Sequence, residues 1–211
     1  MTRDRYLILD IATAPIPEAA DYVEPAQAPA NYKDPEAIAS YVTKKTAERL
    51  AEAALDVDLA RITAVSLFAS GATLQPRALT AEHDAEESLI RLVTCYPDRD
   101  LITYGGFRFD LPMLMRRARY LGVDFPAVNL DRYRSPHVDL LDVLSDRDPS
   151  RRRPLDFYVR RLGWDDLMPK PLSGFEESQV PITKRWNELA QSVTRDVEAV
   201  RRLAQWLGVI A

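Results

Sequence analysis

The sequence predicts an α/β domain with a mixed central sheet flanked by helices. Apolar runs typical of buried strands come first and then alternate with amphipathic segments at helical spacing. The chain has 211 residues, 46% of them apolar and 28% charged, a composition that excludes wholesale disorder. We expect one domain over residues 1–211, with a Pro/Ala-rich loop and a helix inserted at about 14–58.

The N-terminal part begins with a predicted strand at residues 6–10, a short apolar run that ends in an acid. Five prolines among many alanines predict a surface loop over residues 14–35. Asp34 followed by Pro35 is typical of a helix start, and the Ala/Lys/Glu-rich segment after it predicts a helix to about residue 54. Residues 61–70 are almost continuously apolar and predict a central strand.

The middle of the chain predicts two strands and two helices. Residues 73–79 are expected to pair back on the preceding strand as a hairpin. Thr80 is interpreted as the start of a helix, because Glu82 and a helical apolar pattern follow it. Residues 100–104 predict a short strand that two glycines stop, and residues 110–121 predict an amphipathic helix.

The C-terminal part is predicted to be mainly helical. Residues 137–144 are apolar with two embedded acids, and a helix is expected over residues 155–162. Three prolines predict an irregular segment at 169–181. An apolar stripe at helical spacing predicts a long last helix over about 183–207.

Composition excludes several classes of protein. The single cysteine, Cys95, excludes a disulfide framework and a Cys-rich zinc site. No run approaches 18 apolar residues, and the first apolar stretch is too short for a signal peptide, so we expect a cytoplasmic protein without a membrane span. The net charge of −4 gives no general attraction to nucleic acid, so any polyanion must be bound by local basic patches or by metal.

Four acids lie where an acid is costly: at the end of a buried strand, after a Gly-Gly turn, within an apolar segment and at the edge of a helical stripe. Carboxylates near a core need hydrogen bonds, cations or a metal. Three of them also have a structural interpretation: Asp110 and Asp139 as helix caps, and Asp196 as a solvated rim residue. The four are Asp10, Asp110, Asp139 and Asp196.

The segments around these acids carry a resemblance: residues 7–13 (LILDIAT), 104–112 (YGGFRFDLP), 135–140 (SPHVDL) and 196–197 (DV). In this order they resemble the motifs of the DEDD superfamily of 3′–5′ exonucleases, which have a ribonuclease H-like fold. The resemblance is closest to predicted exonucleases related to the proofreading domain of family B DNA polymerases. It covers nearly the whole chain, and the Phe-Asp-Leu-Pro segment is its most specific piece.

The resemblance implies metal-dependent removal of nucleotides from a 3′ end, with DNA the favoured nucleic acid. Two Mg²⁺ or Mn²⁺ ions, roughly 3.5–4 Å apart, activate water and stabilise the leaving oxygen in such sites. By resemblance, Asp10 would bridge both ions, Asp196 would hold the water-activating ion and Asp110 would support the other. The residues implied in substrate binding are Ile11, Thr13, Gly105, Gly106, Phe107 and Phe109.

Three positions depart from the family pattern. Ala12 stands where the family has a metal-binding Glu, Ser192 where it has the Tyr or His that orients the attacking water, and Gly105 where it has Asn. Loss of a positioned base typically costs roughly 10²–10⁴-fold in rate. Three explanations of Ala12 remain open: an introduced inactivating substitution, natural loss of activity, or replacement of the missing acid by another, such as Glu18 or Asp139.

Other functions fit the same residues. The chain is alternatively an inactive exonuclease-fold protein that binds nucleic acid or a protein partner. A haloacid dehalogenase-type phosphatase is disfavoured, because it needs a second Asp where this chain has Ala12. Arg151–Arg153 are candidates for phosphate contacts, whereas Arg160 and Arg161 are interpreted as solvated.

Overall fold

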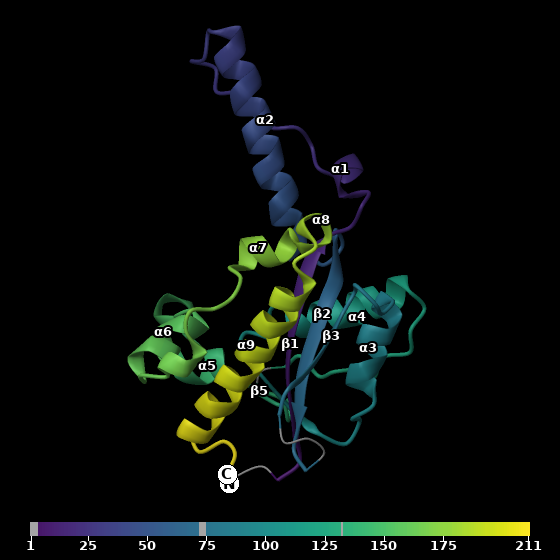
Figure 1. Ribbon diagram of the computed structural model, residues 1–211, viewed down its shortest axis with the longest axis vertical. Coiled ribbons are helices and arrows are strands. Elements are labelled where there is room, and N and C mark those ends of the chain that lie inside the picture. The colour runs from purple at the N-terminus through teal and green to yellow at the C-terminus, as the bar shows by residue number, and fades with distance from the viewer. Residues whose placement is uncertain (1–3, 72–74, 132) are drawn as a thin grey trace.

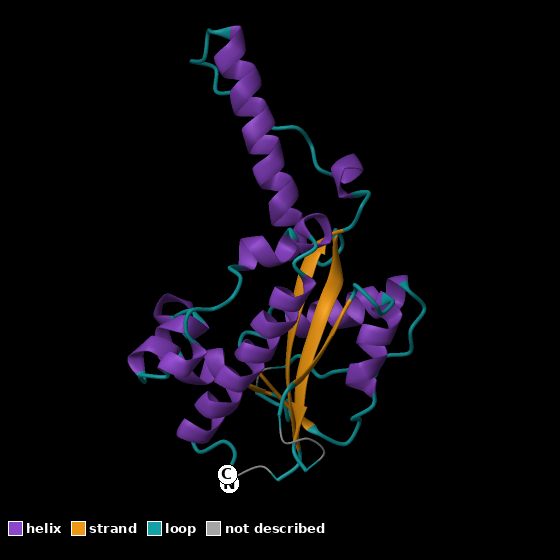
Figure 2. Ribbon diagram, in the orientation of Figure 1, coloured by secondary structure: helices purple, strands orange, loops and turns teal. Residues whose placement is uncertain are grey.

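The computed structural model describes residues 4–71, 75–131 and 133–211. Its centre is one five-stranded sheet with the order β3-β2-β1-β4-β5 (Figure 2). The first three strands in the chain pair antiparallel, and the last two run parallel to the central strand. The mixed sheet confirms the predicted α/β class. The strands are β1 (Tyr6–Pro15), β2 (Ala60–Ala69), β3 (Arg77–Thr80), β4 (Asp100–Thr103) and β5 (Val138–Asp139).

Helices cover both faces of the sheet (Figure 1). The long C-terminal helix α9 packs against β1, β2 and β3 on one face, and α3 and α4 pack on the other. Within the described residues, no helix combines the length and the apolarity needed to cross a membrane. The helices are α1 (Ala19–Tyr22), α2 (Pro35–Glu52), α3 (Glu86–Thr94), α4 (Asp110–Tyr120), α5 (Leu140–Leu144), α6 (Leu155–Arg161), α7 (Gly174–Ser178), α8 (Val180–Thr183) and α9 (Trp186–Trp206), with 3₁₀ turns at Ala53–Leu55, Pro149–Arg151 and Asp165–Leu167.

The central strand β1 distributes its side chains between the two faces by the alternation of a strand. Leu7, Leu9 and Ile11 join the core cluster that contains residues of α3 and α4. Ile8 and Ala12 belong to two other clusters, both containing residues of α9. Asp10 lies between these two positions, on the face that α9 covers.

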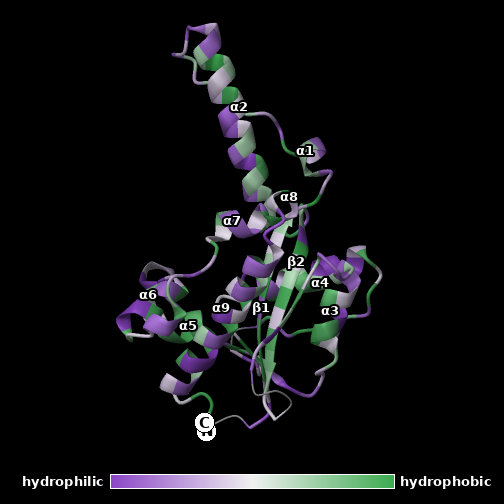
Figure 3. Cartoon of the chain, in the orientation of Figure 1, coloured by the Kyte–Doolittle hydropathy of each residue, from purple (hydrophilic) through white to green (hydrophobic). Residues whose placement is uncertain are grey.

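The predicted insertion forms a helix that projects from the body (Figure 1). The Asp34 side chain accepts a hydrogen bond from the Glu36 amide and caps α2, and Pro35 is the first helical residue, as predicted. None of the 18 residues of α2 is buried, and polar and apolar residues alternate along it (Figure 3). The chain returns to the core at the foot of this helix, where Ala53 and Ala54 are buried.

Several predicted boundaries are wrong. β1 continues to Pro15, beyond the expected end at residue 10, because Pro15 still pairs with Ala60 of β2. The helix expected from Thr80 begins at Glu86, since Thr80 is the last residue of β3. The last helix begins at Trp186 rather than residue 183. The hairpin predicted at 73–79 is confirmed for Arg77 onward, whereas residues 72–74 lie outside the described part of the chain.

The segment 169–181, expected to be irregular, contains α7 and the start of α8. Ser173 and Glu176 form a reciprocal capping box at the start of α7. The expectation of an irregular segment rested on its three prolines. A helix forms here because the capping box satisfies the amides of the first helical turn locally. Helix α7 carries Glu177.

Candidate functional site

Asp10 and Ser66 form a polar break in the apolar sheet face under α9. They are directly opposite each other in the antiparallel β1–β2 pair. The pairs on either side of them, Ile8 with Phe68 and Ala12 with Ala64, belong to two separate apolar clusters. A carboxylate is therefore held at the centre of the sheet, between two patches of core.

Helix α9 places Asp196 over the same part of the sheet. Val193 packs in the cluster that contains Ala12, and Val197 packs in the cluster that contains Ile8. Asp196 lies between these valines on the helix and is only 8% exposed, so it is buried rather than a solvated rim residue.

Asp110 enters the site from the start of α4. It is the first residue of the helix and is 6% exposed; the N-cap position belongs to Phe109, so the capping interpretation of Asp110 is wrong. Burial, together with the nearby charge of Asp139, raises the pKa of Asp110 to about 8. Asp110 is therefore largely protonated at neutral pH.

Asp196 and Asp110 lie close enough to Asp10 for their charges to act on it. Burial raises the pKa of Asp10 well above its usual range, and the charges of Asp196 and Asp110 raise it further. The charge of Lys170 opposes this effect, while Glu177 adds to it. Asp10, Asp110, Asp196, Glu177 and Lys170 thus form one electrostatic cluster, contributed by β1, α4, α9, α7 and the segment before α7.

Lys170 and Glu177 are the members of this cluster that sequence reasoning missed. The Lys170 Nζ atom lies 2.6 Å from Oδ2 of Asp196 and 2.9 Å from Oε1 of Glu177. Burial alone would lower the pKa of Lys170, but the two carboxylates outweigh burial and raise it. The signal that could have found Glu177 is the Ser173–Glu176 capping box, which predicts a helix at this point.

Ser192, at the position where the family has Tyr or His, is fully buried and points away from solvent. Its hydroxyl donates a hydrogen bond of 2.6 Å to Oε1 of Glu177. The same carboxylate lines a cavity together with Ala12. Glu177 therefore lies near position 12, where the resemblance leads us to expect a Glu.

The two acids named as replacements for that Glu have other surroundings. Glu18 is exposed and immediately precedes α1. Asp139 accepts hydrogen bonds from the amides of Gly105, Phe107 and Leu141, at 2.7, 3.2 and 3.0 Å. Asp139 therefore caps α5, as its structural interpretation held, and fixes the loop before Asp110.

The cavity that Ala12 lines has a volume of about 540 Å³ and three of the predicted substrate residues on its wall, Ile11, Thr13 and Phe109. The Thr13 hydroxyl is already used, because it donates a 2.6 Å hydrogen bond to the carbonyl of Ala54. The exposed ring of Phe175, from α7, also lines this cavity. A volume of this size suits a small ligand or one nucleotide.

The other three predicted substrate residues, Gly105, Gly106 and Phe107, have structural roles. Phe107 is 9% exposed and packs its ring 4.3 Å from that of His137, so it is not placed to stack on a base. A Cβ at Gly106 would lie 2.2 Å from the Thr103 hydroxyl, and Gly105 has a φ of +87°. These residues shape the loop that leads to Asp110.

The residues present do not fit a site for two divalent metal ions. In residues 4–71, 75–131 and 133–211, no three acidic, histidine or cysteine side chains are grouped as metal ligands. Both oxygens of Asp196 are engaged, Oδ1 by Arg195 at 2.6 Å and Oδ2 by Lys170. Arg195 also contacts Asp156 at 2.7 Å, so it is held in place from two sides.

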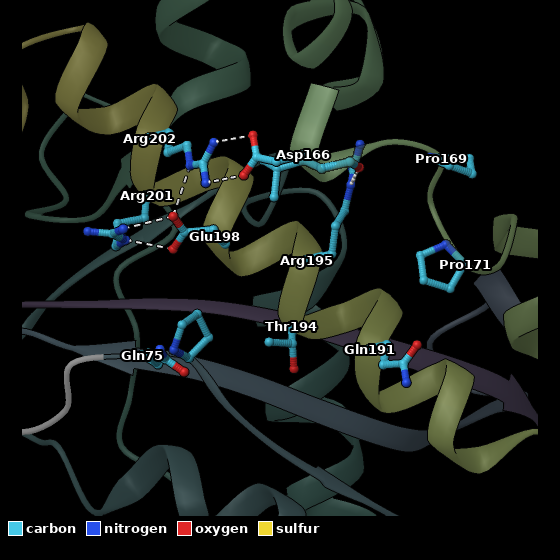
Figure 4. A pocket seen from close by; sticks show the side chains of 12 residues that line it. Gln75, Asp166, Pro169, Pro171, Gln191, Thr194, Arg195, Glu198, Arg201 and Arg202 are labelled. Atoms are coloured by element: carbon cyan, nitrogen blue, oxygen red, sulfur yellow. Dashed lines mark hydrogen bonds and ion pairs between the residues drawn. The ribbon is translucent and has the colours of Figure 1, made fainter. Parts of the chain in front are cut away.

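A second cavity, of about 570 Å³, lies along the outer side of α9 and is rich in arginine (Figure 4). Arg201 and Arg202 both bind Glu198, and Arg202 also binds Asp166. The cations of this cavity are therefore neutralised by neighbouring carboxylates, and it offers little net positive charge to a phosphate.

The candidate arginines of the C-terminal half are largely paired in the same way. Arg151 contacts Asp146 at 2.8 Å and Arg152 contacts Asp142 at 3.0 Å. Arg160 and Arg161 are exposed on α6, as their solvated interpretation expects.

No family model matches the sequence, and no curated protein sequence matches it. Among solved structures, the fold is similar to the family B DNA polymerase of the hyperthermophilic archaeon Pyrobaculum calidifontis. The TM-score is 0.58 and the identity 17%, over 96% of this chain and 24% of the polymerase. The chain therefore spans about a quarter of the polymerase's length. At this identity the likeness shows the fold alone, an α/β fold of the ribonuclease H-like type.

Proposed function

We propose that this protein is an exonuclease-fold module that binds nucleic acid at a 3′ end and lacks efficient hydrolytic activity. The observation that carries the proposal is that the charges of Asp196 and Asp110 act on Asp10, while Ile11 and Phe109, the chain neighbours of Asp10 and Asp110, line the 540 Å³ cavity. Both the sequence motifs and the fold are similar to family B DNA polymerases, which supports nucleic acid as the ligand.

The cavity supplies surfaces that suit a terminal nucleotide. Phe175 is 64% exposed, and Phe109 lies on the wall of the same cavity. Stacking of a base on an aromatic ring is worth roughly 1–3 kcal/mol and tolerates any base. We therefore assign base stacking to Phe175 and Phe109 rather than to Phe107.

Three features argue against efficient hydrolysis. Position 12 carries a methyl group, which cannot bind a cation. The Ser192 hydroxyl is buried and donates to Glu177, so it does not face a water molecule in the cavity. Asp196, the acid assigned by resemblance to the water-activating ion, already holds two cationic side chains.

The test uses linear and circular single-stranded oligonucleotides of one sequence, fluorescently labelled at an internal base. Fluorescence anisotropy in EDTA should show tighter binding of the linear form, because the circle has no end. Equal affinity for both forms, or no binding, would contradict end recognition. Phe175→Ala should weaken binding of the linear form by roughly 5- to 150-fold, the equivalent of one lost stacking contact.

Trp206→Ala is the matched control. Trp206 is 57% exposed at the C-terminal end of α9, at the opposite end of the sheet from α7 (Figure 1). Removing this ring should leave the affinity unchanged. An equal loss in both variants would mean that any exposed aromatic residue contributes and that the cavity is not the site.

A second candidate is a functioning 3′–5′ exonuclease, which the position of Glu177 beside Ala12 favours. The same oligonucleotide, labelled at its 5′ end and incubated with Mg²⁺ or Mn²⁺, distinguishes the two functions. Stepwise shortening by the unmodified protein, abolished by Glu177→Gln, would replace the proposed binding function with this one.

A further inference from the structure

The ammonium group of Lys170 lies between two carboxylates of the acidic cluster. It bridges carboxylates from two separate helices, Asp196 of α9 and Glu177 of α7, at 2.6 and 2.9 Å. All three side chains are largely buried, with exposures of 20% for Lys170, 11% for Asp196 and 13% for Glu177. A contact of this kind in a buried site is much less screened than an ion pair on the surface.

Without this lysine, Glu177 would lose this cationic contact, while Asp196 would keep Arg195. Burial raises the pKa of Asp10, and the charges of Asp196, Asp110 and Glu177 raise it further, so each of these acids disfavours the ionised form of Asp10. Several carboxylates that share one site cannot all ionise unless a cation compensates them. Proteins commonly supply that cation as a hard divalent ion held by carboxylate oxygens from several elements. Here the chain supplies a cationic side chain instead.

We propose that the Lys170 ammonium permanently takes the place of a divalent cation between Asp196 and Glu177. A lysine is a compact point charge with three donors, so it can contact two carboxylates at once. The site thereby keeps its gathered acids and binds no metal. This inference deepens the proposed function, on which it rests for the assignment of the site, and explains binding of nucleic acid without metal.

The Lys170→Met variant separates this role from that of an ordinary buried ion pair. Methionine keeps the length of the side chain and removes its charge, leaving Asp10, Asp196 and Glu177 with less compensation. If Lys170 formed only an ordinary ion pair, the variant would lose stability, and adding a metal ion would not change its stability. If the ammonium takes the place of a divalent metal ion, the variant should recover stability when such an ion is added.

The experiment compares thermal unfolding in EDTA and in sub-millimolar MnCl₂. We expect no shift for the unmodified protein. For Lys170→Met we expect a rise of about 5–10 °C when Mn²⁺ is present at about 100 times its dissociation constant. Lys170→Arg retains the charge and should remain indifferent to Mn²⁺. Lys33→Met is the matched control, since Lys33 is exposed in the loop before α2, and it should show no response.

Two results would overturn the inference: a Mn²⁺ shift of similar size in the unmodified protein, or a folded Lys170→Met variant that does not respond. Calorimetric titration of Mn²⁺ into the unmodified protein is independent of whether the variant folds. Absence of binding supports the inference, and a bound ion overturns it. No oligonucleotide is used, so a metal-responsive Lys170→Met variant of a protein that binds no nucleic acid would overturn the proposed function alone.

Discussion

The hydroxyl of Ser192 donates a hydrogen bond of 2.6 Å to the carboxylate of Glu177, linking α9 to the short helix α7. The same Glu177 oxygen contacts Lys170, so the serine belongs to the charge-compensating network rather than to a water-activating pair. A residue that looks like a degraded catalytic group in the sequence therefore has a defined structural partner.

Ser192→Ala should destabilise the protein by roughly 1–3 kcal/mol, because it leaves a largely buried carboxylate short of a donor. Urea unfolding followed by circular dichroism measures the change. Ser150→Ala is the control, since the Ser150 hydroxyl bonds to Asp148 at the exposed surface and its loss should change little. Equal effects of the two substitutions would show that the Ser192–Glu177 bond contributes nothing specific.

The two glycines before Asp110 should respond differently to substitution. Gly106→Ala would place a Cβ 2.2 Å from Oγ1 of Thr103, a fully buried residue that also holds His137 at 2.8 Å. Overpacking of this kind typically costs about 1–3 kcal/mol. At Gly105 a Cβ would meet only Leu141, at an ordinary 3.5 Å, and the φ of +87° is one that Asn tolerates better than most residues.

Gly105→Asn, which restores the residue usual in the family, should therefore cost less stability than Gly106→Ala. Urea unfolding of both variants, compared with the unmodified protein, measures the difference. The reverse order would mean that the backbone conformation at Gly105, and not the contact with Thr103, limits this loop.

The sequence predicted the parts of the site that lie on regular elements. Local patterns, among them a strand, a Gly-Gly turn and a long helical stripe, singled out Asp10, Asp110 and Asp196 together with Asp139. The resemblance to the exonuclease motifs then selected the first three. Lys170 and Glu177 were missed because their segment has three prolines and no periodicity. What places their side chains is contact with α9, a tertiary interaction with no local sequence signal.

The same distinction separates the elements that were predicted from those that were not. The predicted bounds of β2 and α4 agree closely with the structure, because their apolar patterns are long enough to identify each element. The extension of β1 to Pro15 depends on pairing with Ala60, 45 positions later, and the start of α3 depends on where β3 ends. Such boundaries follow from partners distant in the sequence.

The stability of the protein should fall as pH rises from about 4 to about 8, in part because of Asp110. Its pKa is about 8 in the folded protein against a usual 3.8, so between these values the folded state holds a proton that the unfolded state has released. By linkage, each rise in pH within this window then favours unfolding. Asp110→Asn removes the titrating group and keeps the shape of the side chain.

Thermal unfolding at pH 5, 6, 7 and 8 should show a smaller decline for Asp110→Asn than for the unmodified protein. The variant should be the more stable of the two at pH 8 and lose that advantage toward pH 5. The raised pKa values of Asp10 and Asp139 contribute to the decline in both proteins, so only the difference between the curves reports on Asp110. Parallel curves would contradict a protonated Asp110.

Introducing an acid at position 12 tests the role of Glu177. Ala12 is 3% exposed and packs in a cluster with Ala64 and Val193, and it lines the same cavity as Glu177. Ala12→Glu would bring a further carboxylate to a cluster that has already raised the pKa of Asp10. We expect a loss of stability at pH 8, and a smaller loss for Ala12→Gln, which matches it in size without the charge.

If Glu177 fills the place of the absent acid, the two carboxylates at positions 12 and 177 should repel each other. A double-mutant cycle with Ala12→Glu and Glu177→Gln, measured by urea unfolding, should then give an unfavourable coupling of about 0.5–3 kcal/mol between the two glutamates. In the double variant, Lys170 still has one new carboxylate within its cluster, so part of the stability should return. A coupling near zero would mean that the side chain at position 12 points away from Glu177, and that the two positions are not interchangeable.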